Sequence, residues 1–191
     1  HCNPGSFGTV EYGTALNIIK TAFKEGKRIK VFATETRPKL QGARLTTFEL
    51  MQEGIPVTLI TDNMAAYVME RGLVNAVVVG ADRIFKTGHV INKIGTLGIA
   101  IAAKFYDIPF YVAAPSSTFD LESRPEEVEI EMRDPNEVLY VGSERIAPEG
   151  VEVLNPAFDL TPPELVTAIV CEKGVITPPF EENIEKMLSA N

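Results

Sequence analysis

Polar side chains that could do chemistry stand directly after four short apolar runs of this chain. They are Glu35, Thr36, Arg37 and Gln41 after the first run, Asp62 and Asn63 after the second, Asp82 and Arg83 after the third, and Pro115, Ser116 and Ser117 after the fourth. If the runs are parallel strands, their carboxyl ends meet at one edge of a sheet, where open α/β sheets bind ligands. His1 and Cys2 would join this edge if a further strand lies upstream of them. The pattern predicts a polar site that holds carboxylates, amides and a thiol.

Structural explanations compete with a functional one at several of these positions. Asp62 could cap a following helix, and Glu35 with Arg37 could form an ion pair that holds a loop. Cys2 could be an inert buried thiol, which is the usual state of a lone cysteine. Capping explains Asp82 less well, because no strong helical pattern directly follows it.

The elements that must position these residues follow from the apolar pattern. The four runs, residues 29–35, 57–61, 76–80 and 110–114, are short and almost continuously apolar, as in strands that helices cover on both faces. Helix-length segments alternate with them at residues 12–25, 46–53, 64–71 and 95–105. The alternation predicts an α/β fold, with an open, mostly parallel sheet and helices on both faces.

Prolines interrupt the second half of the chain, and its elements are less regular. We predict a half-exposed strand over residues 126–133, a short strand over 151–154, and helices over 164–172 and 180–188. Cys171 would lie on the core side of the helix over 164–172. The glycines match neither G-x-G-x-x-G after a strand nor G-x-x-x-x-G-K-[ST], so neither nucleotide-phosphate motif is present.

The composition is that of a globular domain and argues against several classes of partner. The 191 residues suit one domain, and 26 acidic against 18 basic residues give a net charge of −8. We therefore predict no nucleic-acid partner, because no basic surface is available for phosphates. No apolar run reaches the roughly 18 residues of a membrane span, which predicts no membrane partner. Cys2 and Cys171 have no zinc spacing, which predicts no metal site and suits a reducing, intracellular compartment.

Several segments at these same residues resemble one known family. They are His1-Cys2-Asn3-Pro4-Gly5, Tyr12-Gly13-Thr14-Ala15-Leu16, Glu35-Thr36-Arg37-Pro38, Gln41-Gly42-Ala43-Arg44, Ile60-Thr61-Asp62-Asn63-Met64, Gly80-Ala81-Asp82-Arg83-Ile84, Asn92-Lys93-Ile94-Gly95-Thr96 and Asn155-Pro156-Ala157-Phe158-Asp159. As a set they resemble methylthioribose-1-phosphate isomerase, in the superfamily that includes regulatory subunits of translation initiation factor two-B. The resemblance covers nearly the whole chain.

The resemblance carries expectations about the whole protein. It implies that residues 1–191 are a single Rossmann-like catalytic domain, the C-terminal part of a longer protein whose helical N-terminal domain is absent here. The start at His1, without a methionine and inside a turn-rich run, agrees with that expectation. The resemblance also implies a cytoplasmic homodimer that acts on a small sugar phosphate without a cofactor.

The implied activity is an aldose–ketose isomerisation in methionine salvage, from 5-methylthioribose 1-phosphate to 5-methylthioribulose 1-phosphate. By match to the family, Asp82 is the proton donor, and Cys2 is the second catalytic residue, as base or transition-state stabiliser. Gln41, Asn92 and Lys93 match substrate-binding positions, with Lys93 facing the phosphate as a point charge. A donor near neutral pH needs a pKa raised by burial, so we expect apolar residues 76–79 to wall Asp82. A proton shuttle and a hydride shift both fit this pattern.

Three other interpretations stay open at this point. Ribose-1,5-bisphosphate isomerase shares the cysteine, the Gly-Ala-Asp and the Asn-Lys-Ile-Gly-Thr motifs, but lacks the Tyr-Gly-Thr-Ala-Leu run found here at residues 12–16. A regulatory binding subunit of translation initiation usually lacks the pair formed here by Cys2 and Asp82. The third is a domain made inactive by truncation, and we expect the chain alone to fold without measurable isomerase activity.

Overall fold

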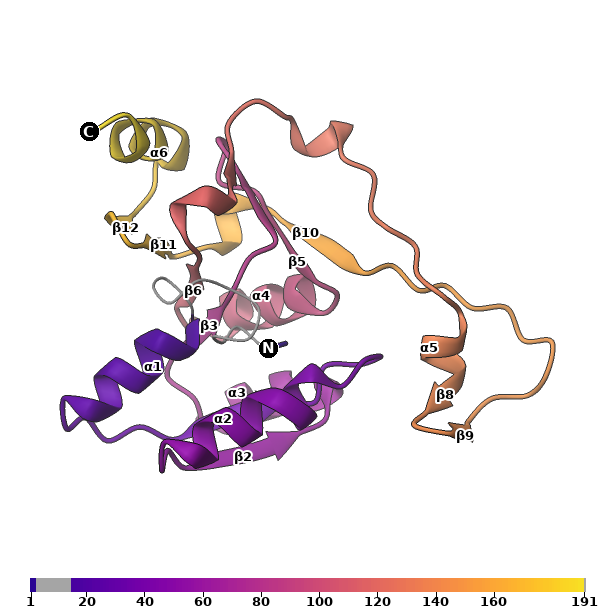
Figure 1. The fold of residues 1–191 in the computed structure, drawn as a ribbon. Coiled ribbons are helices and arrows are strands. Elements are labelled where there is room, and N and C mark those ends of the chain that lie inside the picture. The colour runs from indigo at the N-terminus through magenta and orange to yellow at the C-terminus, as the bar shows by residue number, and fades with distance from the viewer. Residues whose placement is uncertain (3–14, 191) are drawn as a thin grey trace.

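The four strands predicted from the apolar runs lie in two separate sheets (Figure 1). The computed structural model describes residues 1–2 and 15–190. In the first sheet, β1 (Val31–Thr34) pairs in parallel with β2 (Val57–Ile60). The second sheet has the parallel strands β3 (Val77–Val79), β6 (Phe110–Ala113) and β11 (Ala168–Cys171), with β12 (Gly174–Ile176) antiparallel at its edge. The four strands predicted from the apolar runs are confirmed.

Helices connect these strands, as the alternating pattern predicts. They are α1 (Ala15–Lys24), the π-helix η1 (Gly42–Thr46) that continues into α2 (Thr47–Gln52), α3 (Ala65–Glu70) and α4 (Thr96–Phe105). Two of the side chains of α4 that face the core are small, and both of these, Ala100 and Ala103, are fully buried. The α/β fold class is confirmed. The start of the first predicted helix, before Ala15, lies outside the described residues.

A third, mainly antiparallel sheet follows β3 and is not predicted by the sequence pattern. Its hairpin consists of β4 (Arg83–Phe85) and β5 (Val90–Lys93), flanked by β10 (Phe158–Thr161) and β7 (Phe119–Asp120). These strands are only two to four residues long and include charged residues, so they lack an apolar run. The sheet matters for function because it places Asn92 and Lys93 on a strand instead of a loop.

The core is divided between the sheets. The larger cluster joins α3, α4, α6 (Phe180–Ser189) and the second sheet, and its fully buried members include Ile84, Val112 and Ile169. A smaller cluster of Leu16, Leu50 and Ile55 packs α1 and α2 beside the β1–β2 sheet. The predicted C-terminal helix is confirmed as α6, which is amphipathic and buries Phe180 and Ile184.

Three predicted elements of the second half are wrong. Residues 164–172 form a single 3-10 turn, η5 (Pro163–Leu165), followed by strand β11 instead of a helix. Thr167, Ile169 and Val170 are β-branched, and pairing with β6 overrides the weak helical spacing. Cys171 is nevertheless buried, as predicted.

The other two wrong predictions concern strands in the segment around α5 (Asn136–Leu139). Residues 126–133 alternate in polarity, but the only pairing there among described residues is a bridge between Met132 and Pro156. Residues 151–154 form no strand, and Leu154 is 78% exposed. Without a neighbouring strand edge to pair with, a half-apolar pattern does not form a ladder.

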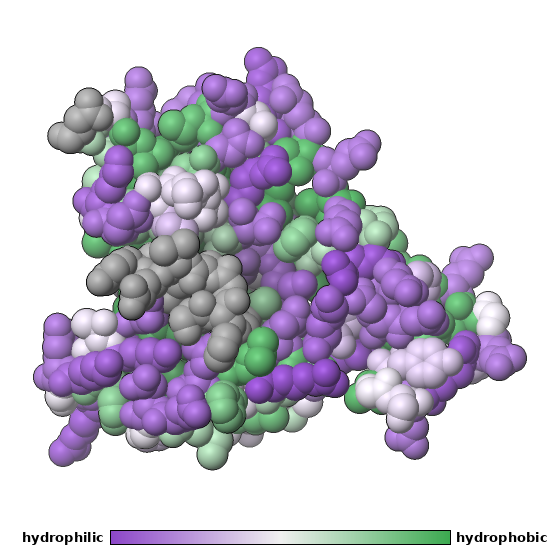
Figure 2. Space-filling model, in the orientation of Figure 1, coloured by the Kyte–Doolittle hydropathy of each residue, from purple (hydrophilic) through white to green (hydrophobic). Residues whose placement is uncertain are grey.

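The segment that carries α5 and the two-residue hairpin β8 (Tyr140–Val141) and β9 (Glu144–Arg145) extends away from the sheets (Figure 1). Figure 2 shows that hydrophilic side chains cover most of the face drawn there. Arg37 anchors the segment, because its guanidinium donates to the carbonyl oxygens of Val138 at 3.0 Å and Tyr140 at 3.5 Å. None of the helices in the described part of the chain is long and apolar enough to cross a membrane.

Two further short turns complete the fold. A 3-10 turn, η3 (Ser116–Thr118), follows β6, and another, η4 (Pro125–Glu127), opens the extended segment.

Candidate active site

The backbone of Cys2 is fixed by Thr36, which follows β1, and by Thr46, the last residue of η1. The Cys2 amide donates to Thr36 Oγ1 at 2.8 Å, and Thr46 Oγ1 donates to the Cys2 carbonyl at 2.7 Å. Cys2 has a φ of 66° and Thr36 a φ of 64°, a left-handed conformation that costs a non-glycine residue about 1–2 kcal/mol. Such conformations cluster at functional sites, where the surrounding contacts hold them. The half-buried, free thiol of Cys2 therefore has a defined position.

Asp62 holds the loop that carries Thr36. Its carboxylate accepts hydrogen bonds from the Thr36 amide at 2.9 Å and from the Arg37 amide at 2.6 Å. Thr61 is the N-cap residue of the 3-10 helix η2 (Asp62–Met64), and Met64 is that of α3. Among the described residues Asp62 therefore caps neither helix, and the helix-capping explanation is wrong. Among the described residues, no ion pair joins Glu35 to Arg37, whose guanidinium contacts backbone carbonyls instead.

His1 connects Cys2 to the loop after β5. Its Nε2 donates to the carbonyl oxygen of Ile94 at 2.8 Å, and its Nδ1 lies 2.7 Å from Thr34 Oγ1. Because a carbonyl oxygen only accepts, Nε2 carries the proton, and a neutral ring accepts from the Thr34 hydroxyl at Nδ1. The side chain is 2% exposed and lies 4.0 Å from Asp62. His1 is therefore a buried link between the first strand and the third sheet.

A glycine makes this link possible. Gly95 has a φ of 102°, and a Cβ atom there would lie 2.9 Å from His1 Nε2. The carboxylate of Asp159 accepts hydrogen bonds from the amides of Gly95 at 2.9 Å and Leu97 at 3.1 Å, at the start of α4. Burial raises the pKa of Asp159, against the opposing effect of these amides. Asp159 thus fixes the loop on which His1 rests.

The predicted substrate-binding residues Asn92 and Lys93 lie at the end of β5, directly before this loop. Asn92 is buried, and its Nδ2 donates to Thr96 Oγ1 at 3.0 Å. The Lys93 ammonium lies 5.5 Å from the centre of the Phe158 ring. Ile94, which follows them, accepts the hydrogen bond from His1. The structure therefore brings Cys2, Asn92 and Lys93 into one neighbourhood.

Asp82 directly precedes β4, the first strand of the hairpin that includes β5. Its amide donates to the Ile91 carbonyl at 2.8 Å, and the antiparallel register that pairs Arg83 with Ile91 puts Asp82 beside Asn92. The side chain of Asp82 is exposed, so the expected apolar wall from residues 76–79 is not found. Residues 77–79 run in β3, which ends before Asp82, and their side chains line other parts of the molecule.

Gln41 directly precedes η1, the helix that also supplies Thr46 to Cys2. Its Oε1 is buried without a hydrogen-bond partner among the described residues. Gly42 lets this helix approach β1, since a Cβ atom there would lie 1.7 Å from the Thr34 carbonyl oxygen. An unpaired buried acceptor is costly unless a ligand or water donates to it.

Other strand-end residues have structural partners. The Ser116 amide donates to Glu172 Oε2 at 2.9 Å, and its hydroxyl donates to the same carboxylate, which lowers the pKa of Glu172. Within residues 1–2 and 15–190, no group of three or more metal-ligating side chains is found.

Comparison with known proteins now identifies the family. The model of the initiation factor 2 subunit family matches residues 1–178. The chain belongs to this family. Relatives in it include methylthioribose-1-phosphate isomerase of Thermotoga maritima, which is 63% identical over 189 residues, or 98% of this chain and 55% of that protein. The 5-deoxyribose 1-phosphate isomerase of Moorella thermoacetica is 63% identical over 190 residues, 99% of this chain and 54% of that protein.

Solved structures of this initiation factor 2 subunit family have the same fold. The isomerase acting on 5-methylthioribose 1-phosphate from Pyrococcus horikoshii OT3 matches with a TM-score of 0.96 at 46% identity, over 100% of this chain and 54% of that one. Translation initiation factor eIF-2B, subunit delta, from A. fulgidus matches with a TM-score of 0.95 at 53% identity, over 98% of this chain and 55% of that one. The chain spans about half the length of the relatives it matches.

Residue-level reasoning missed two members of the neighbourhood, Gly95 and Asp159. Both residues lie in two of the segments that resemble the family. This resemblance is the only sign in the sequence that they belong to the site. Neither follows a predicted strand, because the sheet that positions them comes from short polar strands. The Tyr12 part of the segment that separates the two isomerase alternatives lies outside the described residues.

Proposed function

We propose that this chain is the Rossmann-like half of an aldose–ketose isomerase that converts 5-methylthioribose 1-phosphate to 5-methylthioribulose 1-phosphate. The observation that carries the proposal is the buried His1 link, which joins the Cys2 loop to the strand that bears Asn92 and Lys93. Relatives named for this activity, at 63% identity for the T. maritima protein, support it.

The chemistry needs an acid and a group that assists hydrogen transfer. The C1 oxygen of the substrate carries the phosphate, so its furanose ring cannot open as a free aldose does. In the proposed reaction, Asp82 protonates the ring oxygen as the C1–O bond breaks. Hydrogen then moves from C2 to C1, as a proton or a hydride. The C2 hydroxyl becomes the ketone as its proton passes to the Asp82 carboxylate, which restores the acid. Cys2 acts beside C1 and C2 as base or stabiliser.

The proposed substrate contacts use groups left free by the fold. Among the described residues, no carboxylate pairs with Lys93, so its ammonium is available to the phosphate. The unpaired Oε1 of Gln41 can accept from a sugar hydroxyl, and Asn92 has its amide oxygen for another.

An exposed Asp82 does not fit a general acid at neutral pH in this chain alone. A carboxyl keeps its proton when it is removed from water, and a covered site also strengthens every charge interaction within it. We therefore propose that the part of the longer protein beyond this chain covers Asp82, and that the chain alone has no measurable turnover. Turnover by the isolated chain would contradict this part of the proposal.

A second candidate substrate, 5-deoxyribose 1-phosphate, is favoured by the relative from M. thermoacetica. Both candidates have a neutral substituent at C5, whereas ribose 1,5-bisphosphate has a second phosphate there. Burying that phosphate without a cation would be costly. We expect the longer protein to favour either neutral-C5 substrate over the bisphosphate.

The deciding experiment compares kcat/KM of the longer protein for the three sugar phosphates. A preference for the bisphosphate would refute the proposed substrate class. Absence of turnover with all three would favour the regulatory-subunit interpretation, to which the A. fulgidus structure gives support.

We further propose a cytoplasmic homodimer, to be checked by light scattering and cell fractionation; both cysteines are free, as in a reducing compartment.

A further inference from the structure

The loop between β1 and η1, residues 35–41, carries two groups of the candidate site. Thr36 Oγ1 accepts the hydrogen bond from the Cys2 amide, and Gln41 ends the loop with its buried, unpaired Oε1. Thr36 and Leu40 are both left-handed, with φ of 64° and 65°. A residue with a side chain keeps such a conformation where its surroundings hold it. The contacts that hold this loop therefore decide where Cys2 and Gln41 stand.

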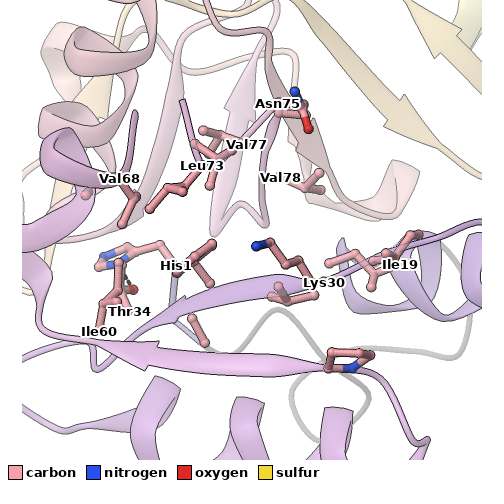
Figure 3. A pocket seen from close by; sticks show the side chains of 18 of the residues that line it. His1, Ile19, Lys30, Thr34, Ile60, Val68, Leu73, Asn75, Val77 and Val78 are labelled. Atoms are coloured by element: carbon pink, nitrogen blue, oxygen red, sulfur yellow. Dashed lines mark hydrogen bonds between the residues drawn. The ribbon is translucent and has the colours of Figure 1, made fainter. Parts of the chain in front are cut away.

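The start of the loop is fixed from the carboxyl ends of β1 and β2. The carboxylate of Asp62 accepts hydrogen bonds from the amides of Thr36 at 2.9 Å and Arg37 at 2.6 Å. His1 lies beside Thr34, the last residue of β1, with 2.7 Å between its Nδ1 and Thr34 Oγ1 (Figure 3). The middle of the loop depends on other contacts, made by its side chains.

The Arg37 guanidinium binds a part of the chain remote in sequence, residues 124–155, which we call the arm. It donates to the carbonyl oxygens of Val138 at 3.0 Å and Tyr140 at 3.5 Å, and to that of Pro38 at 3.0 Å. The arm includes α5 and the β8–β9 hairpin and extends away from the sheets (Figure 1). Both terminal nitrogens of the guanidinium are thus engaged with carbonyl oxygens, which orients Arg37 toward the arm.

A second cation of the loop contacts a fixed point of the arm. The Lys39 ammonium lies 3.6 Å from Glu137 Oε2, and its side chain is 44% exposed. Glu137 also accepts hydrogen bonds from Arg133 at 2.8 and 3.0 Å and from Asn155 at 3.1 Å, so it joins both ends of the arm. An ion pair as exposed as that of Lys39 contributes little. Arg37 is therefore the stronger of the two contacts.

We propose that Arg37 is a positioning residue for Cys2 and Gln41, and that it acts by fastening their loop to the arm. The inference rests on the proposed function, in which both residues contact the substrate. Asp62 holds backbone amides of the loop, and the arm holds its side chains, so the left-handed turn is constrained by two independent contacts. Reactive groups have to be held to about 0.5 Å by such supporting contacts. Release of the arm would free the middle of the loop and displace Cys2 and Gln41.

Amide hydrogen exchange in the longer protein tests this inference without relying on activity. Arg37→Ala removes the main contact with the arm. The reporters are the Cys2 amide, bound to Thr36 Oγ1, and the Leu40 amide, bound to the Thr36 carbonyl at 2.7 Å. We expect their exchange to accelerate at least about tenfold, because the turn then opens locally. Unchanged exchange would overturn the proposal, and so would an equal acceleration at Val112 in the core of β6, which would indicate general loosening.

Arg145 provides a matched control within the arm. It also donates to two carbonyl oxygens, those of Ala147 at 2.8 Å and Pro148 at 3.1 Å, but both belong to the arm itself. Arg145→Ala should leave exchange in the loop unchanged, and an effect equal to that of Arg37→Ala would refute the specific role of Arg37. Lys39→Ala removes the weaker contact, so we expect a smaller acceleration at the same two amides. No acceleration in either loop variant would show that the arm does not hold the loop.

Kinetics separate a positioning residue from one that binds the substrate. With a neutral-C5 sugar phosphate, Arg37→Ala in the longer protein should lower kcat by about 10–100-fold, since small displacements of reacting groups slow catalysis to that extent. KM should change little, and Arg145→Ala should keep the parent kcat. A raised KM with an unchanged kcat would refute the inference, because Arg37 would then bind the phosphate directly. Absence of turnover in the parent would refute the proposed function, whereas the exchange rates would still decide whether the arm fixes the loop.

Discussion

Replacing Gly95 with alanine should damage the junction between the Cys2 loop and α4. The new Cβ would lie 2.9 Å from His1 Nε2, and the ring cannot retreat freely because it is 2% exposed. A φ of 102° adds about 1–2 kcal/mol for any residue with a Cβ. Loss of the hydrogen bond from His1 to Ile94 adds about 0.5–1.5 kcal/mol. We expect a total loss of about 1.5–3.5 kcal/mol in the free energy of unfolding.

Gly98 provides a matched control inside α4, the helix for which Gly95 is the N-cap residue. It lies in α4, it is exposed, and a Cβ there would meet nothing within 4 Å. Alanine is favoured over glycine inside a helix by about 0.8–1 kcal/mol. The same substitution three residues apart is therefore expected to have opposite signs, destabilising at Gly95 and stabilising at Gly98.

Urea unfolding of the two variants and the parent chain, followed by circular dichroism, measures both effects. With slopes of about 1–3 kcal/mol/M, Gly95→Ala should lower the midpoint by roughly 1 M, and Gly98→Ala should raise it. A Gly95→Ala midpoint equal to that of the parent would refute the close contact with His1. So would equal shifts of both variants in one direction, since the expected difference depends on the local geometry of Gly95.

Two further predictions concern carboxylates with different roles. In the longer protein, Asp82→Asn should lower kcat by about 10²–10⁴-fold with a smaller change in KM, and near-normal kcat would remove Asp82 from the mechanism. The pKa of Glu137 is lowered from 4.5 to about 2, mainly by its hydrogen bonds from Arg133, so its charged form stabilises the fold above pH 4.5. Glu137→Gln should therefore cost at most about 3 kcal/mol near neutral pH. The difference from the parent should shrink as the pH falls from 4.5 toward 2, and a difference independent of pH would contradict this cause.

The sequence predicts the parallel part of the fold because that part has the strongest local signal. The strands β1, β2, β3 and β6 come from apolar runs, and burial on both faces produces such runs. The apolar residues of β11 have a spacing that also suits a helix, so the sequence alone does not identify the strand. Its pairing with β6 decides between strand and helix. The hairpin of β4 and β5 has no apolar run, so local patterns contain no sign of it.

The candidate site is predictable to the same extent as the elements that bear it. Open α/β sheets bind ligands at the carboxyl ends of their parallel strands, which share one edge. The positions of Cys2, Asp62 and Asp82 after apolar runs therefore indicate this site from the sequence alone. It does not reveal that Asp62 is a backbone acceptor, since this depends on how the loop at Thr36 folds. Contacts such as that between His1 and Gly95 join residues 94 positions apart and come from tertiary structure alone.

The distribution of charge explains how a chain of net charge −8 could hold an anionic sugar phosphate. Two carboxylates near the site, Asp62 and Asp159, each accept hydrogen bonds from two backbone amides. These amides partly compensate the negative charge of the two carboxylates. The Lys93 ammonium lies over the face of the Phe158 ring, and none of the carboxylates among the described residues pairs with it. An ammonium with free donors attracts phosphate, while the amides compensate the nearby anions. Local pairing, and not the net charge, therefore decides which ligand this edge of the sheet can bind.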